Sequence, residues 1–253
     1  MAKGSLLRAL KSLRYVRGVA NWRDIAVAAW RGDDVLALEL RNGVTIRAAP
    51  GHGMVGMYKE IWYRDAYGLR SDPLRPGATV IDIGANIGIF SLYAAVVGRA
   101  ARVLSYEPFP ESFRLLCGNA EQNRLDAIRA FRLAVAGDRG QRQLYVGLGH
   151  GLNTLLGTPG RTAVSVDCVT LEDVFEREHI DRCDLLKLDC EGAEYEILLN
   201  APRSLLHRID RVAMEYHSVA AHTPDELVAL LETAGFQVRR SRTPVTGYLF
   251  ARR

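Results

Sequence analysis

The chain has 253 residues, of which 48% are hydrophobic and 25% are charged, as in an ordinary globular protein. This length suits one large α/β domain with an extension, and the composition excludes disordered, collagenous and coiled-coil proteins. The formal net charge is +4, but residues 1–31 alone hold seven basic residues and one acidic residue. Because the positive charge belongs to this leader, whereas nucleic-acid enzymes more often carry it around the catalytic cleft, no nucleic-acid partner is expected.

The leader, residues 1–31, predicts a basic amphipathic helix. Its apolar residues recur at helical spacing with basic residues between them, and they are Leu6, Leu7, Leu10, Leu13 and Val16. Such a helix can lie on an anionic membrane surface, or it can pack on its own domain or on a second subunit to make a homodimer. We favour packing over peripheral membrane contact.

Three features predict a cytoplasmic protein. No apolar run approaches the roughly 18 residues of a membrane-spanning helix, and the basic start of the chain is not followed by a secretory cleavage pattern. The four cysteines form no C-x-x-C pair, so we expect free thiols in a reducing compartment.

Residues 1–75 are predicted to form an N-terminal extension. Val35–Leu40 and Val44–Ala48 predict two strands of a β-hairpin, because Asn42-Gly43 between apolar runs is a strong turn signal. An aromatic helix is expected over Met57–Tyr67. Pro73, Pro76 and Gly77 then break the chain, so the main domain is placed at residues 76–253.

In the main domain, predicted strands and helices alternate. The expected strands are Thr79–Ile83, Val103–Tyr106, Ala130–Ala136, Asp184–Leu188 and Val212–Tyr216. The expected helices are Ile87–Val97, Pro110–Asn123, Ala193–Leu199 and Pro224–Ala234, the last capped by Thr223. This alternation predicts an α/β fold with a mostly parallel sheet and helices on both faces. Phe236–Arg240 and Gly247–Ala251 are expected to pair as antiparallel terminal strands, and a hairpin insertion is predicted near residues 141–168.

The most informative motif is a glycine turn after the strand that ends near Asp82. Gly84 would allow the backbone to approach a ligand, and Gly88 would allow the following helix to pack near the strand. The spacing is not the G-x-G-x-x-G of dinucleotide sites, and the charge of Asp82 would repel a pyrophosphate. A cofactor that carries an ammonium group suits this turn better.

Glu107 ends the next predicted strand, 25 positions after Asp82. A carboxylate in this place can accept hydrogen bonds from both hydroxyls of a ribose. Phe109 is then placed to cover one face of an adenine. These features together predict a nucleoside-containing cofactor.

The chain resembles S-adenosylmethionine-dependent methyltransferases of the Rossmann-like class I, and most closely the FkbM family. Asp82–Ser91 resembles the first motif of that family, and Glu107-Pro108 with Asn119 and Asn123 resembles the second. Lys187–Glu194 resembles its most distinctive segment, K-[ILV]-D-x-E-G-x-E, and Met214–His217 fits its last strand.

The resemblance implies a seven-stranded sheet and S-adenosylmethionine as cofactor. It implies a binding site made of Asp82, Gly84, Asn86, Gly88, Glu107, Phe109 and Tyr67. It also implies O-methylation of a hydroxyl on a small molecule, namely a sugar, a glycolipid or a polyketide-type natural product.

The acceptor hydroxyl needs activation because a free alcohol is a poor nucleophile. Asp189 ends one predicted strand, and Glu215 and His217 share one face at the end of the next, so these three are the candidate catalytic residues. In one arrangement His217 or Asp189 removes the proton directly. In the other, Asp189, Glu191 and Glu215 bind Mg²⁺, which acidifies the alcohol. A capping role for Glu191 in the following helix is also open.

Two other functions are open. The first is methylation of RNA or protein, although the [DN]-P-P-[YF] tetrapeptide typical of amino-group methylation is replaced by Asp189-Cys190-Glu191-Gly192. The second is a catalytically silent binding protein with a methyltransferase fold. Cofactor binding distinguishes the enzymes from the silent protein, and the acceptor pool that is methylated distinguishes the two enzymes.

Overall fold

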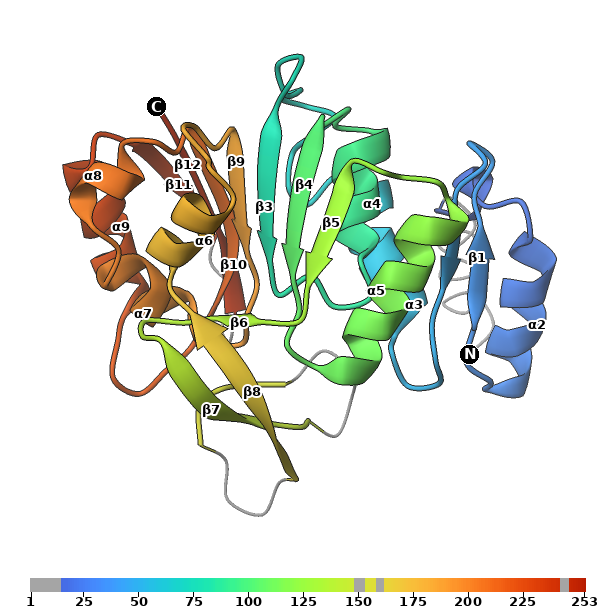
Figure 1. Ribbon diagram of the computed structural model, residues 1–253. Helices are drawn as coiled ribbons and strands as arrows, with labels where there is room; N and C mark the ends of the chain where they lie inside the picture. Colours follow the sequence, from blue (N-terminus) through green and yellow to red (C-terminus); the bar gives the residue numbers. More distant parts are fainter. Residues whose placement is uncertain (1–14, 148–152, 158–161, 242–245) are drawn as a thin grey trace, which may run out of the picture.

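A seven-stranded β-sheet forms the centre of the molecule (Figure 1). The computed structural model describes residues 15–147, 153–157, 162–241 and 246–253. The sheet has the order β11-β12-β10-β9-β3-β4-β5. Its strands are β3 (Thr79–Ile83), β4 (Arg102–Tyr106), β5 (Ile128–Phe131), β9 (Leu185–Leu188), β10 (Arg211–His217), β11 (Gln237–Arg240) and β12 (Thr246–Arg252). Strands β10, β9, β3, β4 and β5 are parallel to one another, and β12 is antiparallel to both β10 and β11, as the sequence predicts.

Alternation along the strands divides the core between the two faces of this sheet. In β3, for example, Ile81 and Ile83 belong to one hydrophobic cluster and Val80 belongs to the other. Because successive side chains of a strand point to opposite faces, an uninterrupted apolar strand needs cover on both sides.

Helices supply that cover. The first cluster includes side chains of α6 (Leu171–Arg177), α7 (Glu194–Leu199), α8 (Arg203–Leu206) and α9 (Pro224–Thr233). The second includes side chains of α4 (Ile89–Val96), with α5 (Pro110–Gln122) packed against it. The predicted start of α9 is confirmed, since Thr223 and Glu226 form a reciprocal capping box ahead of Pro224.

The insertion is a second, three-stranded sheet that lies beside one end of the central sheet (Figure 1). It contains β6 (Ala134–Val135), β7 (Gly140–Tyr145) and β8 (Ala163–Val169), in the order β6-β8-β7. The predicted hairpin is confirmed, with β7 antiparallel to β8. The single strand predicted over Ala130–Ala136 is wrong. The chain leaves the central sheet after Phe131 and enters the small sheet at Ala134, because β6 pairs with β8 instead of β4.

The extension is built from short elements. They are η1 (Tyr15–Gly18), α2 (Trp22–Arg31), β1 (Ala37–Glu39), β2 (Thr45–Arg47), α3 (Met54–Tyr58) and the π-helical turn η2 (Lys59–Tyr63). The hairpin β1–β2 is confirmed. The aromatic helix begins earlier than predicted and ends in η2, where Trp62 donates from Nε1 to the carbonyl oxygen of Ile89 at 3.1 Å. Buried side chains of the extension and of α4 share the second cluster, so these parts pack as one body.

Most of the predicted leader helix falls on residues 1–14, which lie outside the described residues. In α2, Trp30 is 85% exposed and Val27 is also exposed. Membrane contact and dimerisation through residues 1–31 stay predictions. No helix among the described residues has the length and apolarity to cross a membrane.

Candidate functional site

A cavity opens where β3, β4 and β9 end at the carboxyl edge of the sheet. The loops after these strands form one wall, and side chains of α3, η2 and the small sheet form the others. Four of the seven predicted cofactor residues line it, and they are Tyr67, Gly84, Asn86 and Glu107. The carboxyl edge is where ligands bind in open α/β sheets.

The glycine turn is fixed by close approaches within the protein. Gly84 has φ +74°, and a Cβ atom there would lie 1.9 Å from the carbonyl oxygen of Asp189. Gly88 has φ +86°, and its Cβ would lie 2.5 Å from Cδ1 of Leu116 in α5. The expectation that Gly88 lets the helix approach a strand is therefore corrected: the close neighbour is another helix. The absence of a side chain at Gly84 allows the glycine turn to lie against the end of β9.

Asp82 lies beneath this turn and is fully buried. Its Oδ2 accepts a hydrogen bond from Ser91 at 2.6 Å, and its Oδ1 lies 3.0 Å from Nζ of Lys187. Asp82 is not among the residues that line the cavity. The ammonium group that meets this carboxylate belongs to the protein itself.

Sequence reasoning missed Lys187 as a site residue. Its Nζ donates to the carbonyl oxygen of Gly84 at 2.8 Å and lies 3.8 Å from Oδ2 of Asp189. Lys187 thus connects Asp82 and the glycine turn to the end of β9. The available signal was a lysine within the apolar strand Leu185–Leu188, because lysine is almost never fully buried without a partner.

Glu107 is buried and lines the cavity with a prearranged carboxylate. Its Oε2 accepts from the backbone N–H of Asn86 and its Oε1 from that of Phe109, both at 2.8 Å. Burial raises the pKa of Glu107 to about 7, against the opposing effect of these two N–H groups. Each oxygen keeps a second lone pair for another donor.

The aromatic residue beside Glu107 is not the predicted one. Phe109 is the N-cap of α5, packs against the first core cluster and is not among the residues that line the cavity. Tyr106 lines the cavity instead and stacks on Phe131 with ring centroids 4.8 Å apart. Phe109 contributes its backbone N–H, which helps to hold Glu107.

Tyr67 joins the extension to the end of β9. Its hydroxyl donates to Oδ2 of Asp189 at 3.2 Å, and its ring packs edge-on against Phe90. Burial, together with nearby carboxylates, raises the pKa of Tyr67 well above its usual range, so the phenol keeps its proton and remains a donor. One oxygen of Asp189 is thereby held in place.

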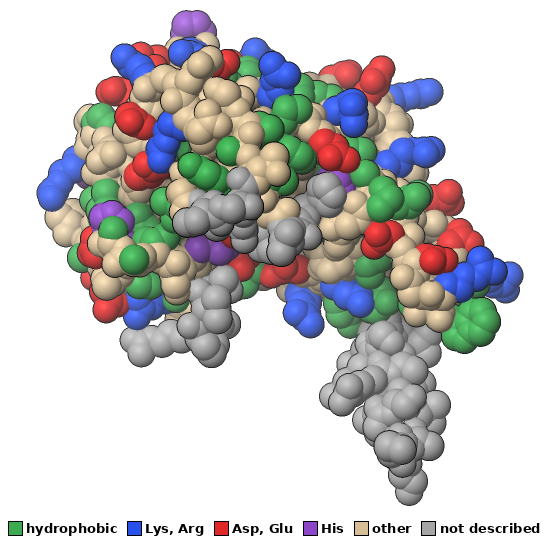
Figure 2. All heavy atoms as spheres, turned by 90° about the horizontal axis from the view of Figure 1, so that it is seen from below, with side chains coloured by type: hydrophobic (Ala, Val, Ile, Leu, Met, Phe, Trp, Pro, Cys, Tyr) green, Lys and Arg blue, Asp and Glu red, His purple; other side chains and the backbone are tan. Residues whose placement is uncertain are grey.

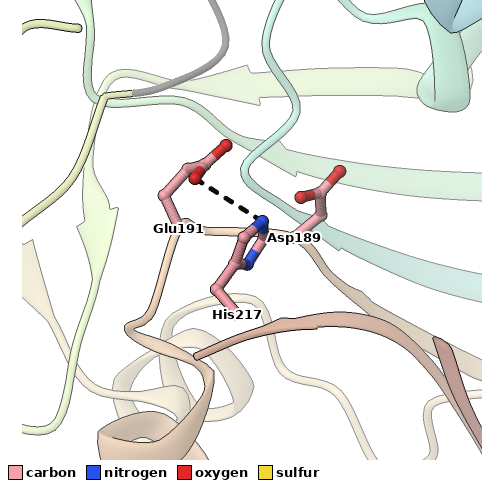
Figure 3. Close-up of side chains that lie close together, drawn as sticks. All are labelled: Asp189, Glu191 and His217. Carbon is pink, nitrogen blue, oxygen red and sulfur yellow. Dashed lines mark ion pairs between the residues drawn. The ribbon is translucent and has the colours of Figure 1, made fainter. Parts of the chain in front are cut away.

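Asp189, Glu191 and His217 converge beside the cavity, and of these three Asp189 and Glu191 line it (Figure 3). One ligand-type atom from each residue lies within 4.8 Å of those of the other two. Nε2 of His217 lies 3.5 Å from Oε2 of Glu191. The predicted meeting of Asp189 with His217 is present in the structure.

Glu215 lies outside this cluster of described residues, contrary to the predicted metal set. It sits two residues before the end of β10, opposite Tyr248 of β12, and Tyr248 donates to its Oε2 at 3.3 Å. Because His217 is the last residue of β10, its side chain reaches the carboxyl edge, whereas that of Glu215 meets the neighbouring strand.

Glu194, which is fully buried, organises this end of the site. Its carboxylate accepts from the backbone N–H groups of Cys190 and Gly192 at 2.8 and 2.9 Å, and its Oε1 lies 3.0 Å from Nδ1 of His217. Burial alone would lower the pKa of His217, but Glu194 and Glu191 raise it to about 9. Burial raises the pKa of Glu191 to about 7, although His217 opposes that shift.

Seen from below, acidic side chains and histidines lie both near the middle of this face and along its outline, and basic side chains are spread along the outline (Figure 2).

Comparison with known proteins places the chain in a family. The model of the methyltransferase FkbM domain matches residues 82–238. The 31-O-demethyl-FK506 methyltransferase FkbM of Streptomyces tacrolimicus is 32% identical over 244 residues, which cover 84% of this chain and 93% of the relative. Methyltransferase sdnD of Sordaria araneosa is 28% identical over 218 residues, which cover 74% of this chain and 83% of the relative.

Among solved structures, methyltransferase FkbM from Methylobacillus flagellatus KT matches with a TM-score of 0.47 and 19% identity. That match covers 69% of this chain and 43% of the other. The strand order described above and the family match carry the assignment: this chain belongs to the FkbM family of methyltransferases and has the Rossmann-like fold of class I.

Proposed function

We propose that this methyltransferase moves the methyl group of S-adenosylmethionine to a hydroxyl oxygen of a small natural product, of the sugar, glycolipid or polyketide type. The observation that carries the proposal is one cavity lined by two strand-end carboxylates, Glu107 and Asp189, with a ring nitrogen of His217 within 4.8 Å of a carboxylate oxygen of Asp189. The name of the Streptomyces relative, which describes methylation of 31-O-demethyl-FK506, supports oxygen as the acceptor atom.

The residues of the cavity fit this cofactor. Glu107 would accept hydrogen bonds from the ribose hydroxyls through the second lone pairs of its two oxygens. Oδ1 of Asn86 is buried without a partner among the described residues, and it would accept a further hydrogen bond from the bound cofactor. Tyr67 and the turn at Gly84 would border the methionine part.

The chemistry is an in-line displacement. S-adenosylmethionine supplies a methyl group on a positively charged sulfur, which is a good leaving group. The acceptor oxygen bonds to the methyl carbon while the carbon–sulfur bond breaks and leaves its electron pair on sulfur. The protein must hold the oxygen in line and provide a group that takes the hydroxyl proton.

Asp189 is the proposed proton acceptor. His217 is the weaker candidate, because a pKa of about 9 keeps its imidazole protonated near neutral pH. Asp189 borders the cavity, and the hydrogen bond from Tyr67 fixes the orientation of its carboxylate. In this proposal Glu215 supports the site through Tyr248, and it does not contact the acceptor.

The first experiment is calorimetric titration of S-adenosylmethionine into the wild type and into Glu107→Ala. The lost charged hydrogen bonds should cost about 1.5–3 kcal/mol, or roughly 10- to 150-fold in affinity. Asp189→Asn should keep cofactor affinity within about threefold and lower turnover by about 10²- to 10⁴-fold.

The acceptor is then found by transfer of labelled methyl from the cofactor into separate pools of hydroxylated small molecules, RNA and protein. Label in the small-molecule pool, on an ether oxygen, is the expected result. A folded wild type that does not bind S-adenosylmethionine would exclude the methyltransferase activity. Label in RNA or protein alone would exclude the proposed acceptor class.

A further inference from the structure

We propose that Asp189, Glu191 and His217 form a binding site for one divalent transition-metal ion, with Mn²⁺ as the probe that tests it. The inference rests on the proposed function, because it assigns the metal to the acceptor end of the same cavity. It replaces the magnesium set expected from the sequence, in which Glu215 held the place that His217 holds here.

The first argument is the convergence of the three ligand atoms. They come from the loop after β9 and from the last residue of β10, and all lie within 4.8 Å of one another (Figure 3). Ligand atoms that each lie about 2.0–2.3 Å from a shared ion are at most about 4.6 Å apart, so small side-chain adjustments suffice to close the site.

The second argument is the way His217 is held. A metal-binding imidazole usually presents one ring nitrogen to the ion and gives the other to a carboxylate that fixes its orientation. Here Nδ1 lies 3.0 Å from the fully buried Glu194, and Nε2 is directed toward Glu191. Glu194 is outside the proposed ligand set, and its bonds to the N–H groups of Cys190 and Gly192 also fix the two residues that flank Glu191.

The third argument is charge. Asp189, Glu191 and Glu194 lie together around His217, and among the described residues the one cation near them outside the proposed ligand set is Lys187. His217 would be neutral when it binds a metal, so it does not compensate these carboxylates in the occupied site. Lys187 is closer to Asp82, at 3.0 Å, than to Asp189, at 3.8 Å. A divalent ion would compensate the remaining negative charge, and its site is open to solvent, since the side chains of Asp189 and Glu191 are 30% and 22% exposed.

The donor set indicates the kind of metal. One imidazole with two carboxylates differs from the all-oxygen sets that suit Mg²⁺ and Ca²⁺, and it fits Mn²⁺, Fe²⁺ or Zn²⁺ better. Three protein ligands leave coordination positions for other oxygens. An acceptor hydroxyl bound there would give up its proton more readily, and the oxygen of Asp189 that does not bind the ion would remain available to accept it.

The test is titration of the metal-free full chain with Mn²⁺ in the absence of acceptor. Binding is measured as the loss of the free-ion signal in electron paramagnetic resonance. We expect saturable binding of one ion per chain, in the micromolar range. Glu191→Gln and His217→Gln should each weaken binding at least tenfold. Glu191 is partly exposed, so its variant is expected to fold even if the His217 variant does not.

Glu215→Gln is the matched control, since it removes a carboxylate from the same strand two residues before His217. It should change Mn²⁺ affinity less than threefold. A strong loss with Glu215→Gln and none with His217→Gln would overturn the assigned ligand set. Mg²⁺ should compete with Mn²⁺ only at concentrations at least tenfold higher, and Mg²⁺ binding that equals or exceeds that of Mn²⁺ would overturn the metal class.

Failure of this inference can be separated from failure of the proposed function. Cofactor titration and methyl transfer are measured in parallel with EDTA. Full transfer in EDTA with no Mn²⁺ binding would overturn the metal site and leave the methyltransferase proposal intact, with His217 and Glu191 forming a simple ion pair. Mn²⁺ binding without binding of S-adenosylmethionine would overturn the methyltransferase proposal and leave the metal site intact.

Discussion

Two buried titratable residues, Glu107 and Lys187, line the end of the cavity proposed to bind the cofactor. Lys187 is compensated by Asp82, whereas Glu107 is held by backbone N–H groups and forms no ion pair with a side-chain cation among the described residues. Burial is therefore the dominant influence on Glu107 and raises its pKa to about 7. A carboxylate in this state changes its charge within the physiological pH range.

Cofactor affinity should consequently depend on pH through Glu107. Above pH 7 the carboxylate is ionised and would accept from both ribose hydroxyls of the proposed cofactor, whereas below pH 7 one oxygen carries a proton and would accept less well. We expect affinity for S-adenosylmethionine to fall up to about tenfold per pH unit below pH 7, as measured by calorimetry from pH 5.5 to 8.5.

Two variants identify the responsible group. Glu107→Gln should bind weakly at every pH and lose the dependence. Glu191→Gln should keep the dependence, although the pKa of Glu191 is also raised to about 7. A wild-type affinity that is constant across this range would contradict the assignment of Glu107.

Among the elements, α5 and its C-cap bond to β2 of the extension through Asn119, Gln122 and Asn123, and Asn119 is the most buried of the three. Asn119 is 1% exposed. Its Oδ1 accepts from the backbone N–H of Arg47 at 2.8 Å, and its Nδ2 donates to the carbonyl oxygens of Arg47 and Ile87. Asn119, which belongs to the second motif of the family resemblance, therefore connects β2, α5 and the glycine turn.

Asn119→Ala should lower the free energy of unfolding by about 2–4 kcal/mol, because it leaves the buried carbonyl of Ile87 and two backbone groups of Arg47 without their side-chain partner. Gln122→Ala is the control: it is on the same helix, is exposed and also bonds to β2, and it should cost less than about 1 kcal/mol. Urea denaturation measures both. Equal effects of the two substitutions would mean that burial of Asn119 is unimportant.

At the scale of the whole molecule, one cavity is lined by segments that are distant in sequence. Met57, Glu60 and Tyr67 come from the extension, Glu107 from the first half of the sheet and Asp189 from the second. The extension also shares the second hydrophobic cluster with α4. A ligand in this cavity should stabilise the extension and the main domain together.

S-adenosylhomocysteine at 100 times its Kd should stabilise the native state by about 2.7 kcal/mol. For a chain of this size the corresponding rise in Tm is about 5–10 °C, and we expect a single calorimetric transition that moves as a unit. Glu107→Ala, at the same ligand concentration, should show a much smaller rise. Two transitions, of which only one responds to ligand, would contradict the common core.

The predictable part of the fold is the part with strong local signals. Hydrophobic periodicity indicates the apolar strands, and turn and capping residues indicate the Asn42-Gly43 hairpin and the Thr223 cap. Each of these features is present in the structure. The division of residues 130–136 between two sheets was not predictable, because strand pairing is decided by partners far away in the chain. Helix α6, capped by Thr170 and Asp173, was missed although its capping box is a local signal.

The candidate site, like the fold, has features that the sequence predicts and features that only the tertiary structure decides. The sequence by itself determined the carboxylates at the strand ends, Glu107 and Asp189, since parallel strands bring their carboxyl ends to one edge. Tertiary structure decided that Asp82 meets Lys187 and that His217, not Glu215, joins Asp189 and Glu191. The physical reason is that ion pairing, burial and the direction of a strand's last side chain depend on residues that are distant in the sequence. The distances between such residues are not encoded locally.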